Sequence, residues 1–210
     1  RGSFAGLVFA FLLLGILRYP KILWIGLILA LLILVLPVGR DYVQHFIEGV
    51  QGQDLATQMR FGEYKDALIL ISRYPWFGVG FSGTPDIDTY LGVSNVYLLI
   101  AEEMGFVGLA AFVATLAAFL AKFVSVTRLA RGGSALEPVF WGSCLAVAGA
   151  MAGGMLDHYL FNLDFPHASA LLWLFVGIGA ASLRLLAAEQ AVGRDGLAGR
   201  GARLVASTED

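Results

Sequence analysis

The sequence predicts an all-α, polytopic integral membrane protein, and three observations lead to that class. Hydrophobic residues make up 58% of the 210 residues and charged residues only 14%, whereas soluble domains contain about 25% charged residues. Uncharged stretches recur at lengths close to the roughly 20 residues that a membrane helix needs. Positive charges collect between alternate stretches, as the loops on one side of a membrane require.

The overall composition also excludes several kinds of protein. The net charge of −2 offers no polybasic surface for nucleic acid. A single cysteine, Cys144, cannot form an internal disulfide or a multi-cysteine metal cluster, and it leaves the redox compartment undetermined. The function must therefore be sought in the few polar residues of a membrane protein.

Five uncharged stretches predict five membrane spans. The last four qualify by length with modest help from their flanks, and the first is short. The chain begins within a span pattern and without an initiator methionine, so we expect a fragment that further spans precede. The predicted spans are residues 2–17, 22–39, 104–121, 138–156 and 165–183.

The positive charges predict the orientation of these spans. Alternating direction brings all the basic clusters to one side, which the positive-inside rule makes the cytoplasm. Residues 40–103 then form a long extracytoplasmic loop, and residues 1–188 a membrane domain. The Gly- and Ala-rich tail, 189–210, is expected to be disordered. The basic clusters are Arg18 and Lys21, then Lys122, Arg128 and Arg131, then Arg184, Arg194, Arg200 and Arg203.

Within the long loop, residues 54–74 predict an interfacial helix that lies on the membrane surface. Asp54 can cap this helix, and Pro75 ends it because proline disfavours helix in the preceding residue. Arg60 and Tyr64 share one helix face by their spacing. A glycine-rich loop follows, and the chain becomes helical again from Ser94 into the third span.

The long loop contains four basic and nine acidic residues, so an anionic substrate there would need individual arginines aimed at its oxygens. Arg60 is the best placed; the alternative is that it pairs with Glu63 or Tyr64 on a solvated face. Arg1 either snorkels to headgroups or faces a cavity. Glu102 and Glu103 precede the apolar stretch, where a carboxylate is either functional or hydrated.

The remaining titratable residues give weaker signals. The short segment between the fourth and fifth predicted spans also lies on the outer side, and it is surrounded by Asp157–His158, Asp164 and His167. These side chains could act as acid–base groups or simply be solvated. His45, in the long loop, has no partner in sequence. The sequence contains no HExxH motif, no Cys/His metal spacing, no phosphate-binding GxxxxGK[ST] loop and no GxSxG nucleophile elbow. We expect no metal and no cofactor.

Four segments, in this order, resemble the O-antigen ligase/polymerase family. The resemblance covers about residues 1–185, the family's C-terminal half, and Arg1-Gly2-Ser3 is similar to its Arg-Gly segment. The four segments are Arg60-Phe-Gly-Glu-Tyr-Lys-Asp-Ala-Leu-Ile, Tyr74-Pro-Trp-Phe-Gly-Val-Gly-Phe81, Ser94-Asn-Val-Tyr-Leu98 and Glu103-Met-Gly-Phe-Val-Gly108.

The resemblance implies a GT-C-like, metal-independent, inverting glycosyltransferase of the bacterial inner membrane, active on the periplasmic face. Such enzymes take a glycan from an undecaprenyl-diphosphate carrier and deliver it to lipid A-core, to another carrier-linked repeat or to protein. Arg1 and Arg60 match the family's two arginines that hold the diphosphate. Fixed cations of this kind stabilise the charge that develops on the leaving diphosphate. Tyr64 and Asn95 are expected to help line the site, and a recess is expected beside Arg60.

One position departs from the family pattern. That pattern has histidine, then Asn, Ser or Gln, then nine residues and Gly-x-x-Gly; here Asn95, nine residues and Gly105-Phe-Val-Gly108 fit, but Ser94 stands at the histidine position. A serine hydroxyl does not act as a base near neutral pH, whereas histidine can. Either another group activates the acceptor or this chain does different work. The candidates are Asp86, Asp88, Glu102 and Glu103, and Glu103 joins Arg60 and Ser94 as an expected catalytic residue.

The resemblance thus implies a ligase-like transferase for lipopolysaccharide or exopolysaccharide assembly. The expected partners are the carrier-linked donor, a glycan or lipid acceptor and the bilayer, with no nucleic acid. A polymerase of the same family is the nearest alternative. A transporter is another, because one family branch carries that label, although nearly all polar residues lie outside the spans. Ser94 also leaves open an inactive assembly protein.

Overall fold

A computed structural model describes residues 2–35, 55–81, 92–127, 134–162 and 166–206. Every regular element in these ranges is helical, which confirms the predicted all-α class. The helices are α1 (Gly2–Leu17), α2 (Pro20–Val35), α4 (Leu55–Arg73), α5 (Val96–Val126), α6 (Glu137–Gly153) and α7 (Pro166–Ala206).

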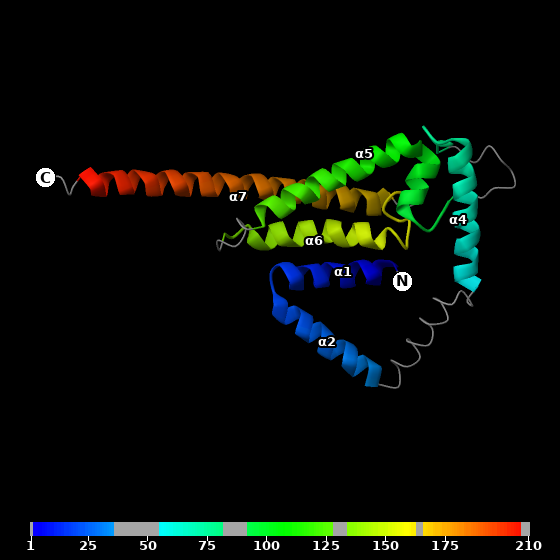
Figure 1. Ribbon diagram of the computed structural model, residues 1–210, viewed down its shortest axis with the longest axis horizontal. Coiled ribbons are helices and arrows are strands. Elements are labelled where there is room, and N and C mark those ends of the chain that lie inside the picture. Colours follow the sequence, from blue (N-terminus) through cyan, green and yellow to red (C-terminus); the bar gives the residue numbers. More distant parts are fainter. Residues whose placement is uncertain (1, 36–54, 82–91, 128–133, 163–165, 207–210) are drawn as a thin grey trace.

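The helices form a bundle with one helix across its end (Figure 1). α1, α6 and α7 run side by side, α6 packing between the other two, while α2 turns back from α1. α5 packs against α6 and α7 and bends near its start, where it meets α4. α4 lies across the end of the bundle at which α1 begins and α6 ends (Figure 1).

The contact between α1 and α6 is made by glycines. A Cβ atom added to Gly6 would lie 2.5 Å from the carbonyl oxygen of Gly149, and one added to Gly149 would lie 2.8 Å from the carbonyl oxygen of Gly6. Gly2 and Gly153 continue the same contact one turn further on. Small residues at four-residue spacing allow membrane helices to approach this closely.

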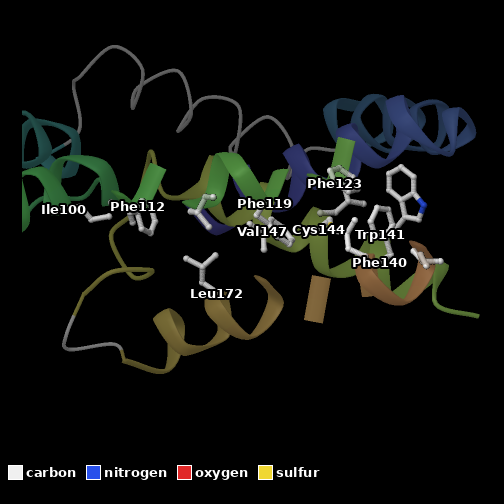
Figure 2. Packing of buried hydrophobic residues seen from close by; sticks show 14 residues of the cluster. Ile100, Phe112, Phe119, Phe123, Phe140, Trp141, Cys144, Val147 and Leu172 are labelled. Atoms are coloured by element: carbon white, nitrogen blue, oxygen red, sulfur yellow. The ribbon is translucent and has the colours of Figure 1, made fainter. Parts of the chain in front are cut away.

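The opposite end of the bundle is filled by large apolar side chains. Phe123, Phe140 and Trp141 gather there (Figure 2), with ring centroids 5.3–5.8 Å apart. Arg18, just past the end of α1, donates a hydrogen bond from Nε to Oε1 of Glu137 at the start of α6, at 2.9 Å. We call this region, from Arg18 through the three rings to Glu137, the closed end.

Two described helices are long and apolar enough to cross a membrane, Val96–Val126 and Pro166–Glu189. Gly2–Leu17 and Lys21–Ile33 are apolar but shorter. No side chain of α2 is buried among the described residues, so α2 offers an apolar surface nearly all round. The chain therefore has membrane-like helices, while the number of five spans and their orientation stay predictions.

Two helices differ in length from their predicted spans. α6 ends at Gly153, and residues 154–156 of the predicted span form a turn. α7 continues to Ala206, through most of the tail for which disorder was expected. Alanine, leucine and arginine favour this continuation and no proline follows Pro166, whereas the four glycines of residues 189–206 oppose it.

Candidate functional site

A break in α5 shapes the end of the molecule that faces α4. At Gly105 the backbone has φ 68° and ψ −173°, which no helix contains. Residues 106 and 107 would ordinarily donate to the carbonyls of residues 102 and 103. Instead, Phe106 N–H donates to Pro75 and Val107 N–H to Trp76. The carbonyls of Glu102 and Glu103 accept from the N–H groups of residues 79 and 80.

Residues 75–80 are thus inserted into the hydrogen-bond ladder of the helix, and every group that the break releases finds a partner in that loop. This satisfies the requirement that backbone polar groups at membrane depth be paired. The break leaves residues 106–126, a length that can span about 30 Å by itself. Residues 96–104 form a separate short segment before the break, and residues 96–103 of it belong to the predicted outer loop.

Glycine is required on both sides of this insertion. A Cβ atom on Gly105 would lie 2.3 Å from the backbone carbon of Trp76, and one on Gly78 would lie 2.4 Å from that of Glu103. Both glycines also have positive φ, which other residues adopt only at a cost. The two sequence segments 74–81 and 103–108 are therefore complementary halves of one structure.

Two acidic residues lie immediately before the break. Glu102 is completely buried; Oε1 accepts from Gly92 N–H at 3.2 Å, and Oε2 has no hydrogen-bond partner within the described ranges. Burial raises the pKa of Glu102 to about 7, and that of Glu103 to about 7 for the same reason. Each carboxylate has a buried oxygen next to the break. The sequence left open whether these carboxylates are functional or merely hydrated, and the complete burial of Glu102 rules out hydration for that residue.

Ser94 joins the loop before α5 to α4. Its hydroxyl donates to Glu63 Oε2 at 2.8 Å, and its backbone N–H donates to the same oxygen at 3.0 Å. The Tyr64 hydroxyl donates to the Ser94 carbonyl at 3.4 Å. Glu63 is therefore bonded to Ser94 and not to Arg60, one of the two partners that sequence alone suggested for the arginine.

Asn95 joins the same loop to the end of α6. Its Oδ1 caps α5 by accepting from the N–H groups of Tyr97 and Leu98, and its Nδ2 donates to the Met155 carbonyl at 2.9 Å. The N–H of Val96 donates to the carbonyls of residues 154 and 157. Residues 63–64, 94–96 and 154–157 thus form one hydrogen-bonded junction, which we call the open end.

A cavity of about 390 Å³ adjoins the open end. It lies between α1, α6 and the start of α7, and its wall is mainly apolar. Gly154 and Asp157, whose carbonyls accept from Val96, belong to both the junction and the cavity wall. The other lining residues are Ser3, Gly6, Leu7, Ala10, Leu145, Ala146, Gly149, Ala150, Gly153, Tyr159, Leu160 and Ala168.

The structure brings together some of the predicted site residues and not others. Tyr64, Ser94 and Asn95 meet at the open end. Arg60 is half-buried one turn before Glu63 on α4, but no α4 residue lines the cavity, so the recess expected beside Arg60 is not the one found. Glu103 lies at the helix break instead. Arg1, His45, Asp86, Asp88 and Asp164 lie outside the described residues.

Other outer residues form a small group near the cavity. His158 Nδ1 lies 3.8 Å from Asp157 Oδ1, and the Asp157 side chain lies against Gly2 at the start of α1. Within the described ranges no three His, Cys, Asp or Glu residues gather as metal ligands would. Glu63 is the residue that sequence reasoning took only as a partner for Arg60. Glu63 contacts Ser94, which lies 31 positions later in the chain, and no periodic spacing in the sequence reveals a contact over that separation.

The sequence model of the O-antigen ligase family matches residues 1–113, which include α1, α2, α4 and α5 through the break. No curated protein and no solved structure matches the chain. The match covers more than half of the 210 residues and includes both halves of the insertion at Gly105. The chain belongs to the O-antigen ligase family.

Proposed function

We propose that this chain transfers a glycan from an undecaprenyl-diphosphate carrier to an acceptor hydroxyl on the periplasmic face of the bacterial inner membrane. Membership of the family implies glycan and lipid substrates and an enzyme of the ligase or polymerase kind. The carrier, the face and the reaction are the proposal. Its main support is the open end, where polar groups of α4, α5 and α6 meet beside an apolar cavity.

The arrangement suits a substrate that is part lipid and part sugar diphosphate. The mainly apolar cavity between α1 and α6 has room for a hydrocarbon chain. α4 presents the Arg60 guanidinium, which has no ion-pair partner within the described ranges and can bind diphosphate oxygens through its planar fork. Arg1, just before α1, is proposed as the second diphosphate ligand. Tyr64 and Asn95 would hold the surrounding loop in place.

The direction of the helices supports a periplasmic open end. The turn between α1 and α2, with Arg18 and Lys21, lies at the opposite end of the bundle from α4 (Figure 1). Lys122 lies near the end of α5, and Arg184 is well along α7, away from its start. Positive charges of this kind favour the cytoplasmic side.

The decisive experiment measures glycan transfer from a purified undecaprenyl-diphosphate-linked donor by the protein in detergent. Arg60→Ala should lower transfer by about 100-fold or more, since a fixed charge that stabilises the leaving group is typically worth that much. Lys65→Ala removes an exposed cation from the same helix and is the matched control. Normal transfer, or a normal surface-polysaccharide profile in cells, with Arg60→Ala would refute the role of the arginine.

The same assay separates the alternatives. Transfer to a second carrier-linked repeat identifies a polymerase, and transfer to a lipid A-core acceptor identifies a ligase. Donor that remains intact with every acceptor contradicts the proposal and favours a transporter or an assembly protein.

A further inference from the structure

Sequence alone left the base that activates the acceptor unassigned, and the structure supplies a carboxylate that was not among the candidates. Glu63 Oε2 accepts two hydrogen bonds from Ser94, one from the hydroxyl and one from the backbone N–H. These bonds fix the position of the carboxylate and leave Oε1 without a hydrogen-bond partner within the described ranges. Glu63 is half-buried, so this second oxygen is within reach of a bound molecule.

The position of Glu63 on α4 places it beside the proposed diphosphate ligand. Residues three apart on a helix have Cβ atoms about 5–6 Å apart, and Glu63 follows Arg60 by three. One helix face therefore carries a cation for the leaving group and a carboxylate for the attacking group.

The other acidic candidates are placed less well. Glu102 is completely buried behind the break, with one oxygen held by Gly92 N–H. The backbone of Glu103 is covered by Gly78 and Gly80 of the inserted loop. Among the described candidates, the Glu63 carboxylate alone is anchored at one oxygen, open at the other and next to an arginine.

We propose that Glu63 is the general base of this enzyme and that Ser94 is its positioning residue. In this step Glu63 Oε1 takes the proton from the acceptor hydroxyl. The acceptor oxygen forms a bond to the anomeric carbon, and the bond from that carbon to the diphosphate oxygen breaks. The electron pair leaves with the diphosphate, which Arg60 stabilises. The inference rests on the proposed function, because it names the base for that transfer.

The test compares Glu63→Gln with wild type in the purified transfer assay. Glutamine keeps an oxygen that can accept from Ser94 but cannot take a proton. We expect kcat to fall by about 100-fold or more, the usual contribution of a general base, with the acceptor KM nearly unchanged. The matched control is Glu189→Gln, since Glu189 Oε2 accepts from the Ser134 hydroxyl at 2.7 Å at the closed end.

Azide separates a base from a merely structural residue. Azide carries no proton, so its attack on the anomeric carbon needs no base, and it should yield glycosyl azide with Glu63→Gln at nearly the wild-type rate. Arg60→Ala should lose both reactions, since the leaving group is common to them. If Glu63→Gln loses azide-dependent donor cleavage as well, or keeps transfer within about threefold of wild type, the inference is wrong.

Ser94→Ala supplies an independent measurement that does not depend on the folding of Glu63→Gln. It keeps the carboxylate and its bond from the backbone N–H, so transfer should fall by no more than about tenfold, the scale of one lost hydrogen bond. A loss of 100-fold or more in Ser94→Ala would assign the role to the hydroxyl and overturn the inference. A wild-type protein that cleaves no donor, with hydroxyl acceptor or azide, would instead refute the proposed function itself.

Discussion

Charged side chains are paired at one end of the bundle and left partly unpaired near the other. At the closed end, Arg18 and Glu137 neutralise each other and three aromatic rings fill the space between α5 and α6. Near the open end α5 is broken, a cavity adjoins the junction, and Glu102 and Glu103 each have a buried carboxylate oxygen that lacks a hydrogen-bond partner in the described part of the chain. Unpaired carboxylates and open space both cost stability. Their concentration near one end supports the proposal that the chain performs its function there.

The largest expected effect is at the break itself. Gly105→Ala combines a positive φ with a Cβ atom 2.3 Å from the Trp76 backbone, and should lower the free energy of unfolding in detergent by roughly 3 kcal/mol or more. Gly80→Ala has positive φ but open space, and should cost roughly 1–2 kcal/mol. Gly142→Ala, in a helix with open space, should be neutral or slightly stabilising. Equal changes in the free energy of unfolding at all three positions would show that the inserted loop, residues 75–80, contributes nothing to stability.

The contact between α1 and α6 should be the next most sensitive. Gly6→Ala places a Cβ atom 2.5 Å from the Gly149 carbonyl oxygen, so the helices must separate at a cost of about 1–3 kcal/mol. Gly26→Ala in α2 meets nothing within 4 Å and is the control. Thermal unfolding in detergent measures both. A Gly6→Ala protein as stable as Gly26→Ala would contradict the close approach of the two helices.

At the closed end, the ion pair should affect stability without affecting transfer. Arg18→Ala and Glu137→Ala should each lower Tm, because each leaves a partly buried charge without its partner. The double variant should lose less than the two single losses added together. Lys21→Ala, which removes an exposed cation nearby, should leave Tm unchanged. Reduced glycan transfer by a folded Arg18→Ala protein would contradict the prediction that the closed end affects stability alone.

The smallest effect is a pH dependence of stability at Glu102, just before the helix break. Burial raises the pKa of Glu102 from 4.5 to about 7, so its protonated form is favoured in the folded protein. Its contribution to stability is complete below pH 4.5 and is lost as pH rises through about 7. Glu102→Gln, which mimics the protonated form, should therefore raise Tm at pH 8 and leave it nearly unchanged at pH 4.5.

The control for this measurement is Glu189→Gln, which removes an exposed carboxylate at the closed end. It should shift Tm equally little at both pH values. A Glu102→Gln protein whose Tm differs from wild type by the same amount at pH 4.5 and pH 8 would show that ionisation of this carboxylate does not affect folding.

Local signals in the sequence predicted the helices well. Long apolar runs marked α1, α2, α5, α6 and α7, and Pro75 correctly ended the helix that is now α4. The break at Gly105 was not predicted, because glycine in an apolar run is common in membrane helices. Its cause is a loop that lies 25–30 positions earlier in the chain, and pairing at that distance has no period to reveal it.

The candidate site was predicted only in part for the same reason. The segments with Tyr64, Ser94 and Asn95 pointed to residues that do meet, while Glu103 was assigned by its closeness to the membrane boundary and lies at the break. Glu63 was weighed only against its helix neighbours, since nothing in the sequence relates it to Ser94. Side-chain contacts between distant segments require the folded chain.

The exchange of hydrogen bonds at Gly105 also has a consequence for where chemistry can take place. A straight helix entering the bilayer would fix its first residues directly above its own axis. Because the inserted loop supplies partners for all four peptide groups, the chain changes direction without leaving a bare amide in hydrocarbon. Ser94 and Asn95 then lie to one side of the line of residues 106–126, where they meet Glu63 of α4 and the Met155 carbonyl.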